Sequence, residues 1–242
     1  MGGHVTPHKL RLYSSVVSQG RGSLRPANQV FVNAELSETY TLKHNLGTET
    51  FYPVFTPNWN TTVYLVSKTS RTFTIAFGTP PSRFTPARIT ARLSTNGGTK
   101  SVSAGGTSST LTHNLGSSSA CFFVTPNWNT TVYISTKTSN AITWAFGTPP
   151  SQASTLYYGR YNLSNSTVLP ADTVAASALS TKLTHSLNLL MADMFFSPYW
   201  NTTVYVDDRL RTVNHLTAKY GNPAPSGGST IDAIAGTADL VA

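Results

Sequence analysis

The chain has 242 residues, of which 39% are apolar and 11% aromatic, so it can bury a core, whereas only 11% are charged. No apolar run approaches the ~18 residues of a transmembrane helix, and the opening Met1-Gly2-Gly3-His4 does not match a signal peptide. Cys121 is the only cysteine, which excludes an intrachain disulfide, and its apolar neighbours indicate a buried position. A weakly charged, polar surface suits a protein held in an assembly better than a cytosolic enzyme.

The first 28 residues predict an extended basic arm. The formal net charge is +8, and the excess of basic residues lies in the first hundred positions, where Glu35, Glu38 and Glu49 are the only acids. Such an arm is expected to bind an acidic partner surface or to stay solvated. Aromatic residues do not alternate with its charges, so nucleic acid is not the expected partner. The expected contacts come from the four basic side chains Lys9, Arg11, Arg21 and Arg25.

Short strands separated by turn residues follow the arm. Residues 29–32, 39–42 and 51–55 each predict a strand, and Pro57-Asn58-Trp59-Asn60 predicts a turn. Apolar residues then alternate with polar ones at 63–67, 72–77 and 88–93, which is the period of half-buried strands. No comparable helical periodicity is present, and the Ala-rich stretch 172–179 is interpreted as a loop or a single turn.

These elements recur twice. The string Thr-Pro-Asn-Trp-Asn-Thr-Thr-Val-Tyr at Thr56–Tyr64 returns at Thr125–Tyr133 and, altered, at Ser197–Tyr205. The Trp residues of the three strings are 69 and 72 positions apart, and His44, His113 and His185 keep the same spacing. A period near 70 residues is long for a solenoid unit and favours small domains. We therefore predict modules at 29–97, 98–168 and 169–242, with linkers or loops at 96–98 and 104–109.

The predicted fold class is all-β. Five or six short strands in each repeat, punctuated by Gly, Pro and Asn every 8 to 12 residues, indicate an antiparallel β-sandwich. The chain is thus expected to consist of three tandem antiparallel β-sandwich modules preceded by the basic N-terminal arm.

A resemblance to known proteins lies in the second repeat. The string Leu111–Gly116, the later Phe-Val-Thr-Pro and the Val-Tyr-Ile-Ser-Thr-Lys-Thr-Ser strand resemble repeats of phage and archaeal-virus structural proteins and the H-type lectin module. The resemblance covers roughly 45 residues of each repeat. It implies a six-stranded sandwich that assembles as trimers and either binds glycans or lies on a virion surface. The third repeat departs from the pattern, with Ser186-Leu187-Asn188 in place of Asn-Leu-Gly, and the sugar-contacting positions of the lectins cannot be identified here.

Catalytic and cofactor chemistry find little support in the sequence. No carboxylate recurs in all three repeats, which argues against paired-carboxylate hydrolysis, and no Gly-rich phosphate loop opens a helix. No catalytic residue, metal ligand or cofactor is therefore predicted. The recurrent His44, His113 and His185 lack nearby second ligands. They could converge on one metal around a pseudo-threefold axis, but the preferred interpretation is a histidine that bonds the backbone of its turn.

The recurrent tryptophans offer a possible contact surface. Trp59, Trp128 and Trp200 lie in Asn-rich turns, where an indole can face a sugar ring or a protein. The preferred interpretation is that each covers its own sandwich. Five asparagines begin Asn-X-Ser/Thr sequons, and these are interpreted as turn and strand residues unless the host glycosylates virion proteins; they are Asn60, Asn129, Asn162, Asn165 and Asn201.

The function favoured by the sequence is a non-enzymatic virion structural protein, a capsid decoration or tail-associated component. It would be made in the host cytoplasm, attach through its arm and associate with itself, as a trimer or larger, and with other virion proteins, but not with membrane. The alternative is a multivalent lectin or adhesin in which three weak glycan sites gain avidity. A major capsid subunit is a weaker alternative, because three similar sets of strands differ from a single jelly roll.

Overall fold

A computed structural model describes the chain over residues 29–31, 38–44, 46–81, 87–118, 120–161, 167–185, 193–207, 212 and 214–236. All regular secondary structure in these ranges is β-strand, which confirms the predicted all-β class. No helix in the described ranges is long and apolar enough to cross a membrane. The basic arm and its four predicted contact residues lie outside the described residues.

The strands form six antiparallel sheets of three strands each. In the first repeat, β6 (Arg88–Ser94) lies between β1 (Gln29–Phe31) and β3 (Tyr52–Pro57), while β5 (Thr72–Phe77) lies between β2 (Thr39–Lys43) and β4 (Val63–Lys68). A register shift follows Leu65 in β4, and another follows Ile134 at the same place in the second repeat. Because the register shifts occur at equivalent positions of β4 and β10, the two repeats share this local backbone geometry.

The same two sheets recur in the rest of the chain. In the second repeat the sheets are β7-β12-β9 and β10-β11-β8, formed by β7 (Gly97–Val102), β8 (Ser108–Thr112), β9 (Cys121–Pro126), β10 (Val132–Lys137), β11 (Ala141–Phe146) and β12 (Ser154–Tyr161). In the third repeat they are β13-β18-β15 and β14-β17-β16, formed by β13 (Thr167–Val174), β14 (Ser180–Thr184), β15 (Asp193–Pro198), β16 (Val204–Val206), β17 (His215–Tyr220) and β18 (Ser229–Gly236).

Each repeat has a hydrophobic cluster that draws on both of its sheets. In the first repeat, Leu65 and Ile75 from one sheet meet Ile89 from the other, and all three are essentially inaccessible to solvent. The second cluster includes the fully buried Trp144, and the third includes Leu216 and Ile231. Pairing of the two sheets removes the apolar faces that meet between them from water, and β3 and β6 carry further buried residues on their other face.

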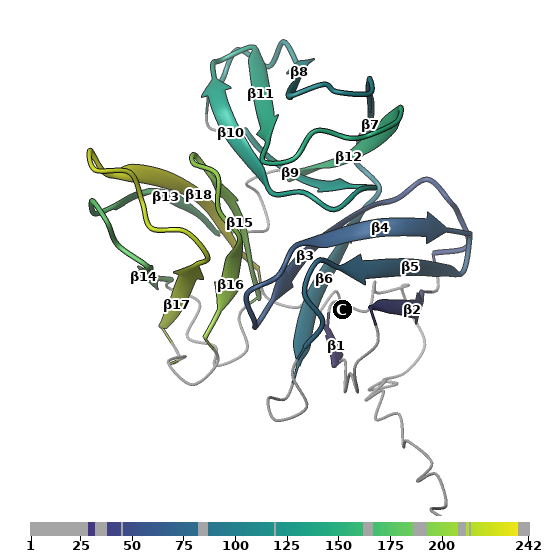
Figure 1. The fold of residues 1–242 in the computed structure, drawn as a ribbon, viewed down its shortest axis with the longest axis horizontal. Helices are drawn as coiled ribbons and strands as arrows, with labels where there is room; N and C mark the ends of the chain where they lie inside the picture. The colour runs from purple at the N-terminus through teal and green to yellow at the C-terminus, as the bar shows by residue number, and fades with distance from the viewer. Residues whose placement is uncertain are drawn as a thin grey trace, which may run out of the picture.

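The three repeats surround a common centre. Figure 1 shows three groups of strands arranged about a middle in which β3, β9 and β15 lie. These three strands contact one another, and the edge strands close a circle, because β4 contacts β9, β10 contacts β15, and β16 contacts β3. The third repeat therefore returns to the first, and the chain forms a closed ring with pseudo-threefold symmetry.

Three sequence predictions about connections are wrong at least in part. The predicted linker or loop at 104–109 ends early, because β8 begins at Ser108. The predicted linker at 96–98 contains the start of β7, since Gly97 and Gly98 pair with Gly159 and Tyr158 of β12. A Cβ at Gly98 would lie 2.4 Å from the Tyr158 hydroxyl, so the glycines allow a close approach inside a sheet. In the stretch 172–179, β13 continues to Val174, and only the following residues form a turn.

Candidate functional site

The axis of the ring is filled at one level by apolar side chains. Val54, Phe123 and Phe195 occupy the same position in β3, β9 and β15 and are 2% exposed each. Together with Cys121 and Ile234 they form a hydrophobic cluster separate from the cores of the repeats. Burial of three side chains that belong to three repeats ties the repeats together through the hydrophobic effect.

A circle of hydrogen bonds from hydroxyl groups lies two residues further along the same three strands. Thr56 donates to the Met194 carbonyl at 2.8 Å, and Thr125 donates to the Pro53 carbonyl at 2.7 Å. Ser197 completes the circle by donating to the Phe122 carbonyl at 3.4 Å. Each bond thus runs from one repeat to another in the same sense. Because these hydroxyls are buried, the bonds also satisfy groups that would otherwise lose water without compensation.

A second circle is formed by the recurrent Asn-Thr-Thr sequence. The bonds run from the Thr62 hydroxyl to Asn129 Oδ1, from Thr131 to Asn201, and from Thr203 to Asn60. A glycine adjoins each bond, and a Cβ at Gly78 would lie 2.2 Å from Thr62 Oγ1 and 2.7 Å from Asn129 Oδ1. Gly147 and Gly221 stand in the same relation to the other two bonds. We call these three Thr–Asn–Gly contacts the interlocks.

A recess of about 100 Å³ lies on the axis beside the interlocks. Equivalent residues of all three repeats line it, among them Thr62, Thr131 and Thr203 and the three prolines that end β3, β9 and β15. Ligand pockets for small molecules are usually ~300 Å³ or larger. The recess therefore has room for waters or a small ion, and not for a sugar residue. The lining hydroxyls of Thr62, Thr131 and Thr203 already donate to the interlocks.

The interface between the first and second repeats contains a lysine surrounded by aromatic rings. Lys68 Nζ lies 4.9 to 5.2 Å from the ring centroids of Phe51, Tyr52 and Tyr157, the last of which belongs to the second repeat. The ammonium also donates to the carbonyls of Glu49 and Phe51 at 2.7 Å. Burial lowers the pKa of Lys68, and the carboxylate of Glu49 opposes that effect. Cation–π attraction and two hydrogen bonds thus hold the charge, and no ion pair between described residues includes Lys68.

The interface between the second and third repeats handles the equivalent lysine differently. Lys137 Nζ lies 2.6 Å from Asp232 Oδ2 of the third repeat, and the exposed fractions of the two side chains are 11% and 9%. Tyr199 donates to the same carboxylate at 3.4 Å. Burial and the neighbouring Asp232 raise the pKa of the Tyr199 hydroxyl, and burial raises the pKa of Cys121 to about 11. The hydroxyl and the thiol are therefore protonated at neutral pH.

The three recurrent histidines lie within their own repeats. His44 is 4% exposed, contacts the carbonyl of Thr69 through Nε2 at 3.1 Å, and accepts the Leu46 N–H through Nδ1. Nδ1 of His113 accepts the Leu115 N–H in the same way. His185 is 2% exposed. In the part of the chain that the structure describes, no group of three His, Cys, Asp or Glu residues could hold a metal ion.

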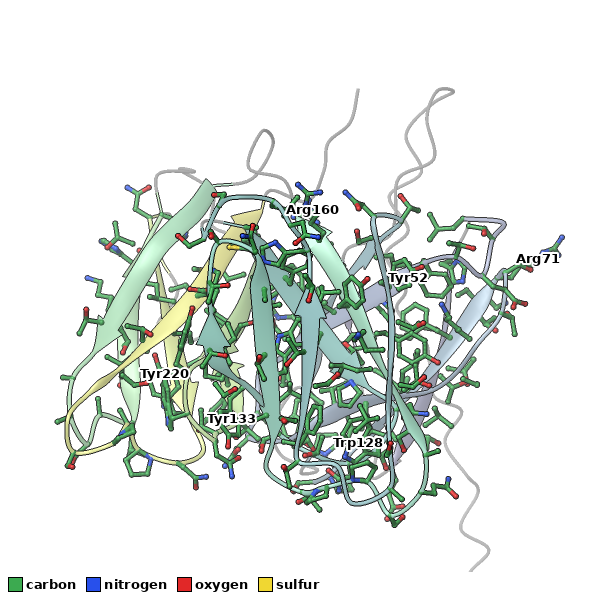
Figure 2. All side chains as sticks on the ribbon, turned by 90° about the horizontal axis from the view of Figure 1, so that it is seen from above. Tyr52, Arg71, Trp128, Tyr133, Arg160 and Tyr220 are labelled. Atoms are coloured by element: carbon green, nitrogen blue, oxygen red, sulfur yellow. The ribbon has the colours of Figure 1, made fainter. Side chains whose placement is uncertain are left out.

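The three recurrent tryptophans lie against the ends of their own repeats. The indole N–H of Trp59 donates to the Thr79 carbonyl, that of Trp128 to Thr148, and that of Trp200 to Asn222. Each ring meets the aromatic residue that ends the central strand edge to face, at centroid distances of 4.8 to 5.1 Å. Both edges of the indole are therefore engaged, and Trp200 is only 6% exposed. Figure 2 shows Trp128 at the end of the molecule opposite Tyr52 and Arg160.

The sequence missed the role of the interlock residues. Asn60, Asn129 and Asn201 were expected to shape turns, yet each accepts a bond from another repeat. The signal was present, because Asn-Thr-Thr and the later aromatic–Gly pair recur in all three copies. No protein-family model, no curated protein and no solved structure matches the chain.

Proposed function

We propose that the chain is a non-enzymatic structural protein of a virion, a capsid decoration or tail-associated component, built from three tandem β-sandwich modules and attached through its basic arm. The observation that supports this proposal best is the closed ring. An apolar cluster, two circles of hydrogen bonds and three edge-strand contacts all serve to hold repeats together. A body organised in this way is a rigid building block with three similar outer faces.

The distribution of polar groups along the axis agrees with a structural role. Enzymes need an activated nucleophile, an acid–base pair or a metal in a pocket. The recess on the axis is small, and its hydroxyls donate to asparagine side chains that also belong to the ring. The buried Lys137–Asp232 pair joins two repeats. In the described residues the polar side chains of the ring thus stabilise its assembly.

The strands around the axis already contact one another, so they are not available to other chains. Association between chains would therefore use the arm and the outer faces of the ring. Exposed basic side chains bind acidic surfaces by attraction that salt screens. We therefore expect an assembly larger than the 26.0 kDa chain that depends on Lys9, Arg11, Arg21 and Arg25.

The test is light scattering of the full chain and of a variant in which these four residues are replaced by Gln. The native chain should form trimers or larger particles at low salt, and the arm variant should have the mass of one chain. A control variant loses four basic residues outside the arm instead, Lys43, Arg71, Lys100 and Lys182, and should assemble like the native chain. A chain that stays monomeric in every variant, or assembles equally without the arm charges, would sink the proposal.

The glycan-binding alternative gains less from the geometry. Each Trp is held by its own repeat through the indole N–H and an aromatic neighbour, so none stands free as a platform. Trp59 and Trp128 are nevertheless partly exposed. A glycan array probed with the native chain and with Trp128→Phe distinguishes the two functions. Glycan binding that the substitution weakens would move the assignment to a lectin.

A further inference from the structure

His113 and His44 occupy the same position but use their rings differently. Both accept a backbone N–H through Nδ1, which places the proton of the neutral ring on Nε2. Nε2 of His44 meets the Thr69 carbonyl, and His44 is buried. His113 is partly exposed and its Nε2 has no hydrogen-bond partner in the described part of the chain. The second repeat therefore presents a free imidazole N–H donor just after the end of β8.

Arg160 stands beside this histidine in the place of a core residue. Its Cα pairs with that of Phe122, so the two side chains lie on the same face of their sheet, and the His113 ring packs on Phe122 at a centroid distance of 5.2 Å. The equivalent residue of the first repeat is Leu93, which is 7% exposed in the hydrophobic cluster. Nε of Arg160 is buried without a hydrogen-bond partner. Figure 2 shows the side chain at the upper end of the molecule.

The charge around these donors is not balanced. Burial lowers the pKa of His113, and the positive charges of Arg160 and Lys137 lower it further. Asp232 is the carboxylate that pairs with Lys137. Among the described ion pairs none includes Arg160. Among the described side chains, no carboxylate forms an ion pair with this guanidinium or accepts a hydrogen bond from the neighbouring imidazole.

We propose that His113 and Arg160 form a binding site for an oxyanion group, a phosphate, a sulfate or a carboxylate, at this end of the second repeat. A guanidinium presents N–H donors in a planar fork that fits such groups, and the imidazole adds a further donor. The buried Nε–H of Arg160 has no hydrogen-bond partner, so the described residues do not compensate the charge of the guanidinium at that atom. The third repeat has Ala235 at the position of Arg160, so the ring carries one such site.

The test compares sodium sulfate with sodium chloride at equal ionic strength, using the native chain and Arg160→Leu. Leu occupies this position in the first repeat, so the variant is expected to fold. Sulfate should raise the melting temperature of the native chain and shift the NMR signals of His113. In Arg160→Leu, both effects should require a sulfate concentration at least ten times higher. Arg71→Leu, which removes an exposed arginine that Figure 2 shows at a distance from Arg160, should respond like the native chain.

The pH dependence gives an independent measurement. Protonation of His113 adds a positive charge to the site, so sulfate affinity should rise as the pH falls through the pKa of His113, which lies below the ordinary histidine value. The charged groups near the ring are Arg160, Lys137 and the Asp232 carboxylate that pairs with Lys137. His113→Gln keeps a donor but should lose this rise. Equal sulfate responses in the native chain, Arg160→Leu and His113→Gln would overturn the site.

Two further probes identify the source of the anion. Phosphate and glucuronate are titrated separately at the same ionic strength. A response to phosphate alone assigns a free or nucleotide-type phosphate, and a response to glucuronate assigns the carboxylate of an acidic sugar. Absence of any response to sulfate, phosphate and glucuronate in the native chain would reject the proposal. None of these results depends on whether the chain belongs to a virion.

Discussion

The interface between repeats one and two and that between repeats two and three place a lysine at the same position and stabilise it by different chemistry. Lys68 is held by three aromatic rings and two backbone carbonyls. Lys137 is held by a carboxylate that also accepts a tyrosine hydroxyl. The position in the neighbouring repeat decides which solution is used, because Tyr157 and Asp232 stand at equivalent places in β12 and β18. The backbone geometry of the ring is therefore compatible with more than one way to bury a charge.

The largest effect should follow Asp232→Ala. Removal of the carboxylate leaves Lys137 buried without a counter-ion, which costs about 3 kcal/mol in free energy of unfolding. Urea denaturation measures the loss. The double variant Lys137→Met with Asp232→Leu should recover most of it, since apolar pairs often replace buried ion pairs at little cost. A loss below about 1 kcal/mol for Asp232→Ala would mean that water reaches the pair.

The interlocks should show a smaller effect that is equal at the three interfaces. A methyl group at Gly147 would lie 2.2 Å from Thr131 Oγ1, so Gly147→Ala must displace the Thr131–Asn201 bond and should cost about 2 kcal/mol. Gly78→Ala and Gly221→Ala should cost the same. Gly227→Ala is the control, because no atom lies within 4 Å of an added Cβ there. A large difference among the three losses of unfolding free energy would mean that the interlocks, like the lysine environments, differ from one interface to the next.

Lys68→Met should cost less than Asp232→Ala, about 1 kcal/mol. The substitution loses two hydrogen bonds and the cation–π contacts, but the methionine fills the same ring-lined space without stranding a charge. The unfolding midpoint in urea measures the difference. If Lys68→Met lowers the free energy of unfolding as much as Asp232→Ala or more, the lysine at the first interface contributes at least as much to stability as the ion pair at the second, contrary to this prediction.

The smallest effect at neutral pH concerns Cys121, which lies in the axial cluster beside the ion pair. Its pKa is raised to about 11 in the folded chain, so the unfolded chain releases the thiol proton first as the pH rises. The contribution of the protonated thiol to stability is present below pH 9 and is lost between about 9 and 11. The unsubstituted chain should therefore lose stability relative to the Cys121→Ala variant as the pH rises from about 9 to about 11. At pH 8 the native thiol should react with iodoacetamide far more slowly than the unfolded chain.

The sequence predicted the strands well because their signal is local. Alternation at 63–67 and 72–77 corresponds to β4 and β5, and the turn residues around Trp59 separate β3 from β4. The linker prediction at 96–98 failed because two glycines usually mark a loop, whereas here Gly98 faces the Tyr158 side chain inside a sheet. Composition alone does not reveal which neighbour removes the room for a Cβ.

The ring and the oxyanion site depend on contacts between distant residues. Thr203 and Asn60 are separated by more than half the chain, and only the recurrence of Asn-Thr-Thr hinted at a shared role. Arg160 looked like an ordinary strand residue until its register with Phe122 placed it on the face of the core. Asp232 likewise carried no pattern that pointed to Lys137.

The covalent continuity of the ring changes how its contacts can diverge. In a trimer of identical chains, one substitution alters all three interfaces at once, and an unfavourable change is multiplied by three. Here a single codon alters one interface, while the connections between repeats keep the other surfaces at high effective concentration. A lysine facing a tyrosine at one junction and an aspartate at the next is a kind of asymmetry that a trimer of identical chains cannot accumulate.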